Sequence, residues 1–168
     1  MSSFQLTEKT RKLLLDEIKA NISSALAAVR TDRNDASVTT EPPRKYFIYD
    51  GPNTFECPCL FVVVDSAEFP EEALGNNFPY AYVKVYVAVV VEDRDKAALV
   101  IKSERYQAAL FSILHRKTLN DTIDNVKLYS RVVRLEFSPV ITDVPDKTKG
   151  TFQKEVVLEL EVRHAECP

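Results

Sequence analysis

One strand-forming stretch, residues 81–91, constrains the fold of this chain more than any other part of the sequence. Every second residue in it is apolar, and the residues between are mostly apolar too, with Lys84 as the exception. A strand with two apolar faces is expected inside a sheet, with helices on one face and other material on the second. The charged turn at 92–95 then leads directly into a helical pattern. Asp93 or Asp95 can cap that helix, because a carboxylate accepts hydrogen bonds from free backbone N–H groups.

Two amphipathic helices are predicted, one near residues 8–30 and one near residues 96–116. The spacing of apolar residues in both segments follows the helical repeat. Thr7 is a reasonable N-cap for the first helix, and Thr10 is the alternative one turn later. The apolar stripe of the first helix comprises Leu14, Ile18, Ile22, Ala25, Leu26 and Val29. The inward side of the second is predicted to comprise Ala97, Ile101, Ala108, Phe111 and Leu114.

Five strands are predicted, rich in β-branched and aromatic residues. They lie near residues 45–49, 59–64, 80–91, 127–137 and 152–164. The last strand alternates cleanly, with Val156, Leu158, Leu160 and Val162 on its inward face. The strand before it allows two alternations, with either Leu128 and Val132 inward, or Tyr129, Val133, Leu135 and Phe137 inward. The fold class predicted is α+β: two helices packed on one mostly antiparallel mixed β-sheet, with a long C-terminal hairpin.

Length and charge exclude several classes of protein. The chain has 168 residues, which suits a single domain over 1–168, with a polar connecting arm at 31–44. The formal net charge of −3 argues against a general DNA-binding surface, which needs clustered Lys and Arg. No apolar run is long enough to span a membrane, and the first residues lack the layout of a secretory signal. A cytosolic site of synthesis is therefore expected.

The sequence shows no catalytic constellation, so neither a catalytic residue nor a cofactor is predicted. The three glycines all fall in predicted turns, which excludes a glycine-rich phosphate loop. His115 lies at a helix end and His164 at a strand end, and no nucleophile signature accompanies either. The carboxylates of the turn at 92–95 are explained by helix capping. We expect that the protein is not an enzyme.

Three cysteines, Cys57, Cys59 and Cys167, raise the question of a metal site. Together with His164 they would give four zinc ligands of suitable type. However, the single residue between Cys57 and Cys59 is a tighter gap than zinc sites use. An odd number of cysteines in a chain that is not exported indicates free thiols. We therefore favour free thiols and predict no metal.

Two long polar loops, 65–79 and 139–151, are the candidate contact surfaces. Loops of this length in a compact domain commonly carry binding residues. The first loop holds apolar residues that could anchor a protein partner, and the second holds charges that could set its register. The candidate interface residues are Phe69, Asn76, Asn77, Phe78, Pro79, Asp143, Asp146, Lys147 and Lys149.

The order of these elements is similar to that of a known protein family. The segment YAYVKVYVAVVVEDRDKAALVIKSERYQAALFSIL, followed by the hairpin KLYSRVVRLEFSPVITDVPDKTKGTFQKEVVLELEV, resembles the tail terminator (tail completion) proteins of tailed bacteriophages. The resemblance covers roughly residues 10–164 and rests on the order of elements. It implies a virion structural protein that forms a homomeric ring, commonly a hexamer, at the end of the tail tube. Such a ring ends tube polymerisation and offers a docking face to the head and neck.

The resemblance also implies where the protein works and with what. The expected location is the tail–neck junction of a virion that is assembled in the host cytoplasm. The expected partners are further copies of the chain, the tail tube protein and a neck or head-completion protein. DNA is expected to pass through the lumen without specific binding.

Two other classes of protein remain open on the sequence. One is a phage neck or head-completion (head–tail joining) protein, which shares the size and the long loops. The other is a non-enzymatic α+β module that binds a small ligand or a protein.

Overall fold

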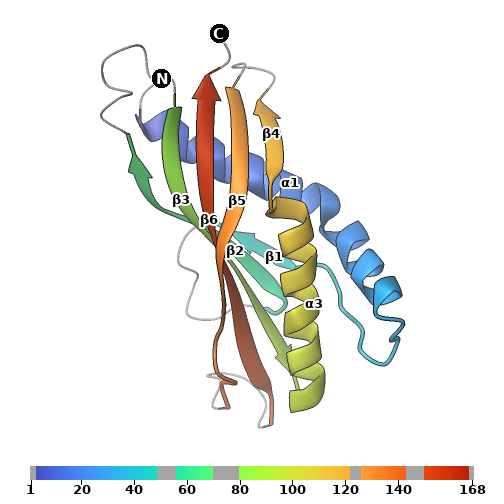
Figure 1. Cartoon of the computed structure of the whole chain (residues 1–168). Helices are drawn as coiled ribbons and strands as arrows, with labels where there is room; N and C mark the ends of the chain where they lie inside the picture. The colour runs from blue at the N-terminus through green and yellow to red at the C-terminus, as the bar shows by residue number, and fades with distance from the viewer. Residues whose placement is uncertain (1–2, 49–55, 70–79, 122–125, 143–149, 167–168) are drawn as a thin grey trace.

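The predicted fold class is confirmed. The computed structural model describes residues 3–48, 56–69, 80–121, 126–142 and 150–166. They form one six-stranded sheet in the order β1-β2-β3-β6-β5-β4, in which only β1 and β2 run parallel (Figure 1). The elements are α1 (Ser3–Asp32), β1 (Lys45–Phe47), β2 (Cys59–Glu68), β3 (Tyr80–Asp93), α3 (Lys96–Leu114), β4 (Lys117–Asp121), β5 (Val126–Phe137) and β6 (Phe152–Glu166).

The centre of the molecule is the pair β3 and β6, as the sequence predicted. Their inward side chains are fully buried in one core beneath both helices. Alternate residues of β3 face that core because side chains in a strand point to opposite faces in turn. On the other face, Ala88 and Val90 pack with Cys59 and Phe61 in a second, smaller cluster. The buried inward residues are Val83, Val85, Val87, Val156, Leu158, Leu160 and Val162.

Helix α1 buries the predicted apolar stripe, but its N-terminal prediction was wrong. Leu14, Ile18, Ile22 and Leu26 are buried against the sheet and α3. The helix begins at Ser3, so neither threonine proposed as its cap stands at its start. Thr10 instead lies inside the helix, fully buried. Its hydroxyl donates a 2.8 Å hydrogen bond to the carbonyl of Leu6 one turn earlier, and this local bond explains why a capping residue type is tolerated there.

Helix α3 begins as predicted, at an aspartate cap. The Asp95 carboxylate accepts a 2.8 Å hydrogen bond from the backbone N–H of Ala97. Asp93 steadies the turn before it by accepting a hydrogen bond from the N–H of Asp95 and pairing with Lys102 at 2.5 Å. The charged turn that ends the central strand therefore has a structural role.

The predicted inward side of α3 is confirmed for Leu114 and for Phe111, which packs against the core, but not for Ala97, Ile101 and Ala108. Ala97 is exposed, and Phe111 is half-buried. The apolar pattern misled because two polar residues, Ser103 and Arg105, are buried and interrupt the true stripe. The buried residues of α3 are Leu99, Ser103, Arg105, Tyr106, Ala109, Leu110, Ile113 and Leu114.

The buried Arg105 explains the course of the connecting arm. α1 continues to Asp32, so the arm is two residues shorter than predicted. Arg105 donates hydrogen bonds to the carbonyl of Val38 and, at 2.7 Å, to the carboxylate of Asp35. The hydroxyl of Tyr106 donates to the carbonyl of Glu41. These bonds fasten the arm along α3.

Several strand boundaries differ from the prediction, and one strand was not predicted. β1 ends at Phe47, two residues early. β2 continues to Glu68, so residues 65–68 extend the strand instead of opening the first long loop, and residues 66–68 pair with β3. The short strand β4 was not predicted, because the sequence KTLND carries little strand signal, and it forms only by pairing with β5.

β5 follows the first of the two alternations left open by the sequence, and the second is wrong, since its residues Tyr129, Val133, Leu135 and Phe137 are all exposed. Leu128 and Val132 are buried, as the first alternation requires. An extra residue, Val133, then shifts the register between Val132 and Arg134. After this β-bulge, Leu135 faces the helix-bearing side, but it is 39% exposed because α3 packs mainly on β6 and β3.

Candidate assembly surface

The structure describes one of the nine interface residues predicted from the sequence. Phe69 follows directly after β2, with 36% of its side chain exposed, as a contact residue requires. The other eight residues lie outside the described ranges: Asn76, Asn77, Phe78, Pro79, Asp143, Asp146, Lys147 and Lys149.

Exposed apolar side chains lie on both faces of β5 and on the segment after it. Single exposed apolar residues are common on monomers, whereas apolar residues that gather in a patch are typical of contact surfaces. Sequence reasoning missed this surface, although a strand with two apolar alternations was its signal: one of the two had to face outward. The residues are Tyr129, Val133, Leu135, Phe137 and Ile141.

The face of the sheet opposite the helices carries charges that neutralise one another. Lys84 pairs with Glu159 across β3 and β6 at 3.1 Å. Arg131 on β5 lies 3.6 Å from Glu161 on β6. Hydrogen bonds with Tyr86 and Glu159 raise the pKa of Lys84 above its usual range, so the ammonium stays charged and paired. Among the described residues no helix covers this face, which carries these compensated charges beside the smaller apolar cluster around Ala88 and Val90.

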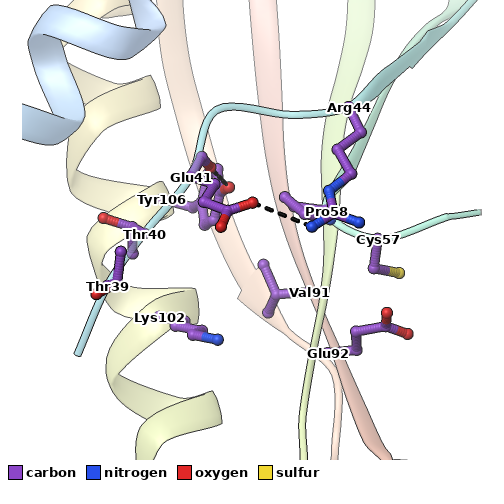
Figure 2. Close-up of a pocket in the computed structure, with 10 residues that line it drawn as sticks. All are labelled: Thr39, Thr40, Glu41, Arg44, Cys57, Pro58, Val91, Glu92, Lys102 and Tyr106. Atoms are coloured by element: carbon purple, nitrogen blue, oxygen red, sulfur yellow. Dashed lines mark hydrogen bonds and ion pairs between the residues drawn. The ribbon is translucent and has the colours of Figure 1, made fainter.

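A pocket of about 230 Å³ lies between the arm, α3 and the end of β3 (Figure 2). Its two cationic side chains already have carboxylate partners. Arg44 pairs with Glu41 at 3.1 Å, and Lys102 pairs with Asp93 at 2.5 Å. The charge of each cation is therefore already neutralised by a carboxylate, which makes the pocket a poor site for an anionic ligand. The lining residues are Thr39, Thr40, Glu41, Arg44, Cys57, Pro58, Val91, Glu92, Lys102 and Tyr106.

The two thiols beside this pocket are poor candidates for chemistry. Cys57 and Cys59 are both free and buried. A hydrogen bond with Cys57, together with burial, raises the pKa of the Cys59 thiol far above its ordinary value. Because the thiolate is the form that attacks substrates and binds metals, Cys59 remains inert at neutral pH.

The arrangement of His164 opposes the zinc site considered from the sequence. Gln153 contacts Cys57 with its side chain at 3.6 Å, and His164 lies eleven residues further along the same strand, β6. At about 3.3 Å per residue the histidine is roughly 35 Å from the thiols. Among the described residues no group of three or more metal-ligand side chains forms, and Cys167 lies outside them.

His164 instead belongs to the core. Its Nε2 lies 2.6 Å from the hydroxyl of Thr10. That hydroxyl already donates its hydrogen bond to the carbonyl of Leu6, so the Nε2–H of His164 donates and the hydroxyl of Thr10 accepts. Burial, with a contribution from Lys9, lowers the pKa of His164 to about 4, so the ring is neutral at pH 7. His115, the C-cap of α3, stacks on Phe111.

The chain is similar to a chain of known structure. No protein-family model matches the chain, and no curated protein matches it. A solved structure described as the virion of a native gene transfer agent particle contains a matching chain. The two are 13% identical, the match covers 92% of this chain and 93% of that one, and the TM-score is 0.47. At this level the likeness assigns no function. No described helix is both long and apolar enough to span a membrane.

Proposed function

We propose that the chain is a virion structural protein that closes the end of a phage-type tail tube as a homomeric, hexameric ring. In this role it ends polymerisation of the tube and offers a docking face to the neck. The ring acts at the tail–neck junction of the virion, after assembly in the host cytoplasm. No catalytic step is part of this function.

The observation that carries the proposal is the order of elements. The family that the sequence resembles implies an N-terminal helix, a long strand, a charged turn, a helix and a terminal hairpin. This chain has α1, then the fourteen-residue β3, a charged turn whose Asp95 caps the next helix, then α3, and the hairpin of β5 and β6. These parts form one sheet with both helices on one face, which is a rigid body suited to repetition in a ring.

The bare face of the sheet suits the lumen of such a ring. Helices take up more room than strands, so they fit on the outside, where the circumference is larger. The inner face would then present Lys84–Glu159 and Arg131–Glu161, whose charges are already compensated. DNA affinity comes from uncompensated Lys and Arg, so this lining favours passage of DNA without retention.

The loops after β2 and β5 are the proposed axial contacts. Phe69 marks the start of the first, at the end of β2, and its exposed ring is the proposed anchor for the tube protein or the neck protein. The bridge between Ile141 and Gln153 holds the start of the second loop against β6.

The proposal is tested by electron microscopy of particles assembled without this gene. Overlong tails, or tails not joined to heads, are expected, because nothing ends the tube and the docking face is missing. Tails of normal length that fail to join would instead favour the neck or head-completion function. Normal tails already joined to heads would refute both.

A further inference from the structure

Two stretches of strand at opposite sides of the sheet have no strand partner among the described residues. β1 pairs with β2 only as far as Phe61, so residues 62–68 form one free edge. β4 pairs with β5 only as far as Ser130, so residues 131–137 form the other. A free edge exposes unpaired N–H and C=O groups, and it is a template for a strand from another chain.

The two free edges lie at the same level across the sheet. The ladder joins Ser66, Lys84, Glu161 and Arg131 in one row. It joins Val62, Val87, Leu158 and Leu135 in another. A neighbouring copy, rotated about an axis along the strands, would therefore bring its β2 edge beside this β5 edge without an axial shift. β2 and β5 run in opposite directions, so the contact would be antiparallel.

Each of the two edges carries one β-bulge, and the two bulges lie in neighbouring intervals of the ladder. Between the two rows, the inner strands β3 and β6 each place four residues, 84–87 and 158–161. Each edge strand has one more, because Asp65 is the extra residue of β2 and Val133 that of β5. Two edges of equal length can form a regular ladder with each other. In that ladder Arg131 faces Ser66, Val133 faces Val64, and Leu135 faces Val62.

Charge complementarity favours the same register. The β5 edge carries Arg131 and Arg134, both more than half exposed, and the β2 edge carries the exposed Asp65 and Glu68. In the matched ladder Arg131 is the diagonal neighbour of Glu68, and Arg134 that of Asp65. Diagonal neighbours lie about 7–8 Å apart at Cα, within reach of long side chains. Their present partners, Glu161 and Glu136, are partly exposed, so exchanging them costs little.

We propose that a second copy of this chain docks here, with residues 131–135 of the β5 edge of one copy pairing antiparallel with residues 62–66 of the β2 edge of the next. The contact is head-to-tail, and a heterologous contact of this kind closes into a ring when the rotation allows. The exposed apolar residues Val133 and Leu135 become covered in it. This inference rests on the ring of the proposed function and names the surfaces that build it.

Engineered cysteines test the contact directly. One variant carries Val133→Cys and Val64→Cys, and another carries Arg134→Cys and Val63→Cys. Within one chain these strands are three strand spacings, about 14 Å, apart, whereas a disulfide needs Cα atoms within about 7 Å. Mild oxidation of either variant at up to millimolar protein is expected to give a ladder of covalent oligomers that reduction dissolves. Each single-cysteine variant and the unaltered chain, which keeps its native thiols, are the controls and should give no ladder.

A charge exchange supplies the second measurement. Arg131→Glu with Arg134→Glu is expected to weaken self-association by about tenfold, and so is Asp65→Arg with Glu68→Arg. The chain with all four changes should regain its self-association, because the charges on the two edges again attract each other with their signs exchanged. No recovery, or no ladder, overturns the edge pairing.

The outcomes separate this inference from the proposed function. Rings detected by native mass spectrometry without cross-links at these positions would overturn the edge pairing and leave the tail function intact. A cross-linked ladder, together with normal joined tails in particles lacking the gene, would support the edge pairing and refute the tail function. Dimers that form equally from single-cysteine variants would mean a two-fold contact and would overturn the head-to-tail pairing.

Discussion

Replacing Val87 by aspartate tests the assignment of the core. Val87 is completely buried, and it lies between Val62 of β2 and Leu158 of β6 beneath the helices. The change removes the packing of two methyl groups, at about 2 kcal/mol, and buries a carboxyl group without a partner, at about 3 kcal/mol more. The sum is comparable to the total stability of many domains, about 5–15 kcal/mol. For a chain of this length we expect the melting temperature to fall by about 10–20 °C, or the protein not to fold.

The matched control is the same substitution at an exposed valine. Val100 lies on α3 and is 37% exposed, away from both free sheet edges. Val100→Asp should change the free energy of unfolding by less than about 1 kcal/mol. Thermal and urea unfolding, followed by circular dichroism at micromolar protein, measure both variants. A folded Val87→Asp protein with the parent's melting temperature, or equal losses in both variants, would refute the burial assignment.

Three further predictions concern the arm, the buried histidine and the thiols. Arg105→Met should speed amide hydrogen exchange in the arm and lower the free energy of unfolding by about 1–3 kcal/mol, because the carbonyl of Val38 loses its donor. The control Lys102→Met leaves the hydrogen bonds of the arm intact, so it should not speed exchange there. Lowering the pH from 7 to 4 should reduce the free energy of unfolding by up to about 3 kcal/mol. Unfolded His164 takes up a proton below about 6.5 and the folded ring only below about 4, so this stability is full above pH 6.5 and is lost as the pH falls. Urea titrations of His164→Leu should show a weaker pH dependence over that window, and an unchanged one would contradict the assignment. Metal analysis of purified protein should find no stoichiometric zinc, since His164 lies far from Cys57 and Cys59; about one zinc per chain would overturn this.

The elements predicted correctly from the sequence are those in which buried apolar residues recur at a regular spacing. β3 and β6 alternate strictly, and their inward residues are all buried in the core. The buried face of α3 could not be predicted in the same way, because Arg105 is buried through hydrogen bonds to an arm that is far away in the sequence. Residues 65–68 have a loop-like composition and form a strand only because β3 offers them a partner.

The assembly surface was less accessible to sequence reasoning than the fold. Loop length and apolar loop residues pointed to Phe69, which is exposed. The exposed side chains of β5 were missed, because their exposure depends on the bulge at Val133 and on how far α3 extends over the sheet. A bulge leaves no mark in an apolar sequence. The equal length of the two edges, each with one bulge at Val133 or Asp65, becomes visible only when residues are counted along aligned strands.

The proposed edge pairing fixes the width of the ring. Each copy contributes four strands that share the same rows, β2, β3, β6 and β5. A hexamer joined through the free edges would form a closed sheet of roughly 24 strands, and at about 4.8 Å per strand its circumference would be about 115 Å. Opposing backbones would then be about 37 Å apart, or somewhat more if the strands tilt. Barrels of 16–18 strands already enclose an aqueous channel, so a sheet of this width leaves room for a DNA duplex after side chains are added. Image averages of isolated rings measure this width, and an inner wall built of helices, or backbones much closer than about 35 Å, would contradict the edge pairing.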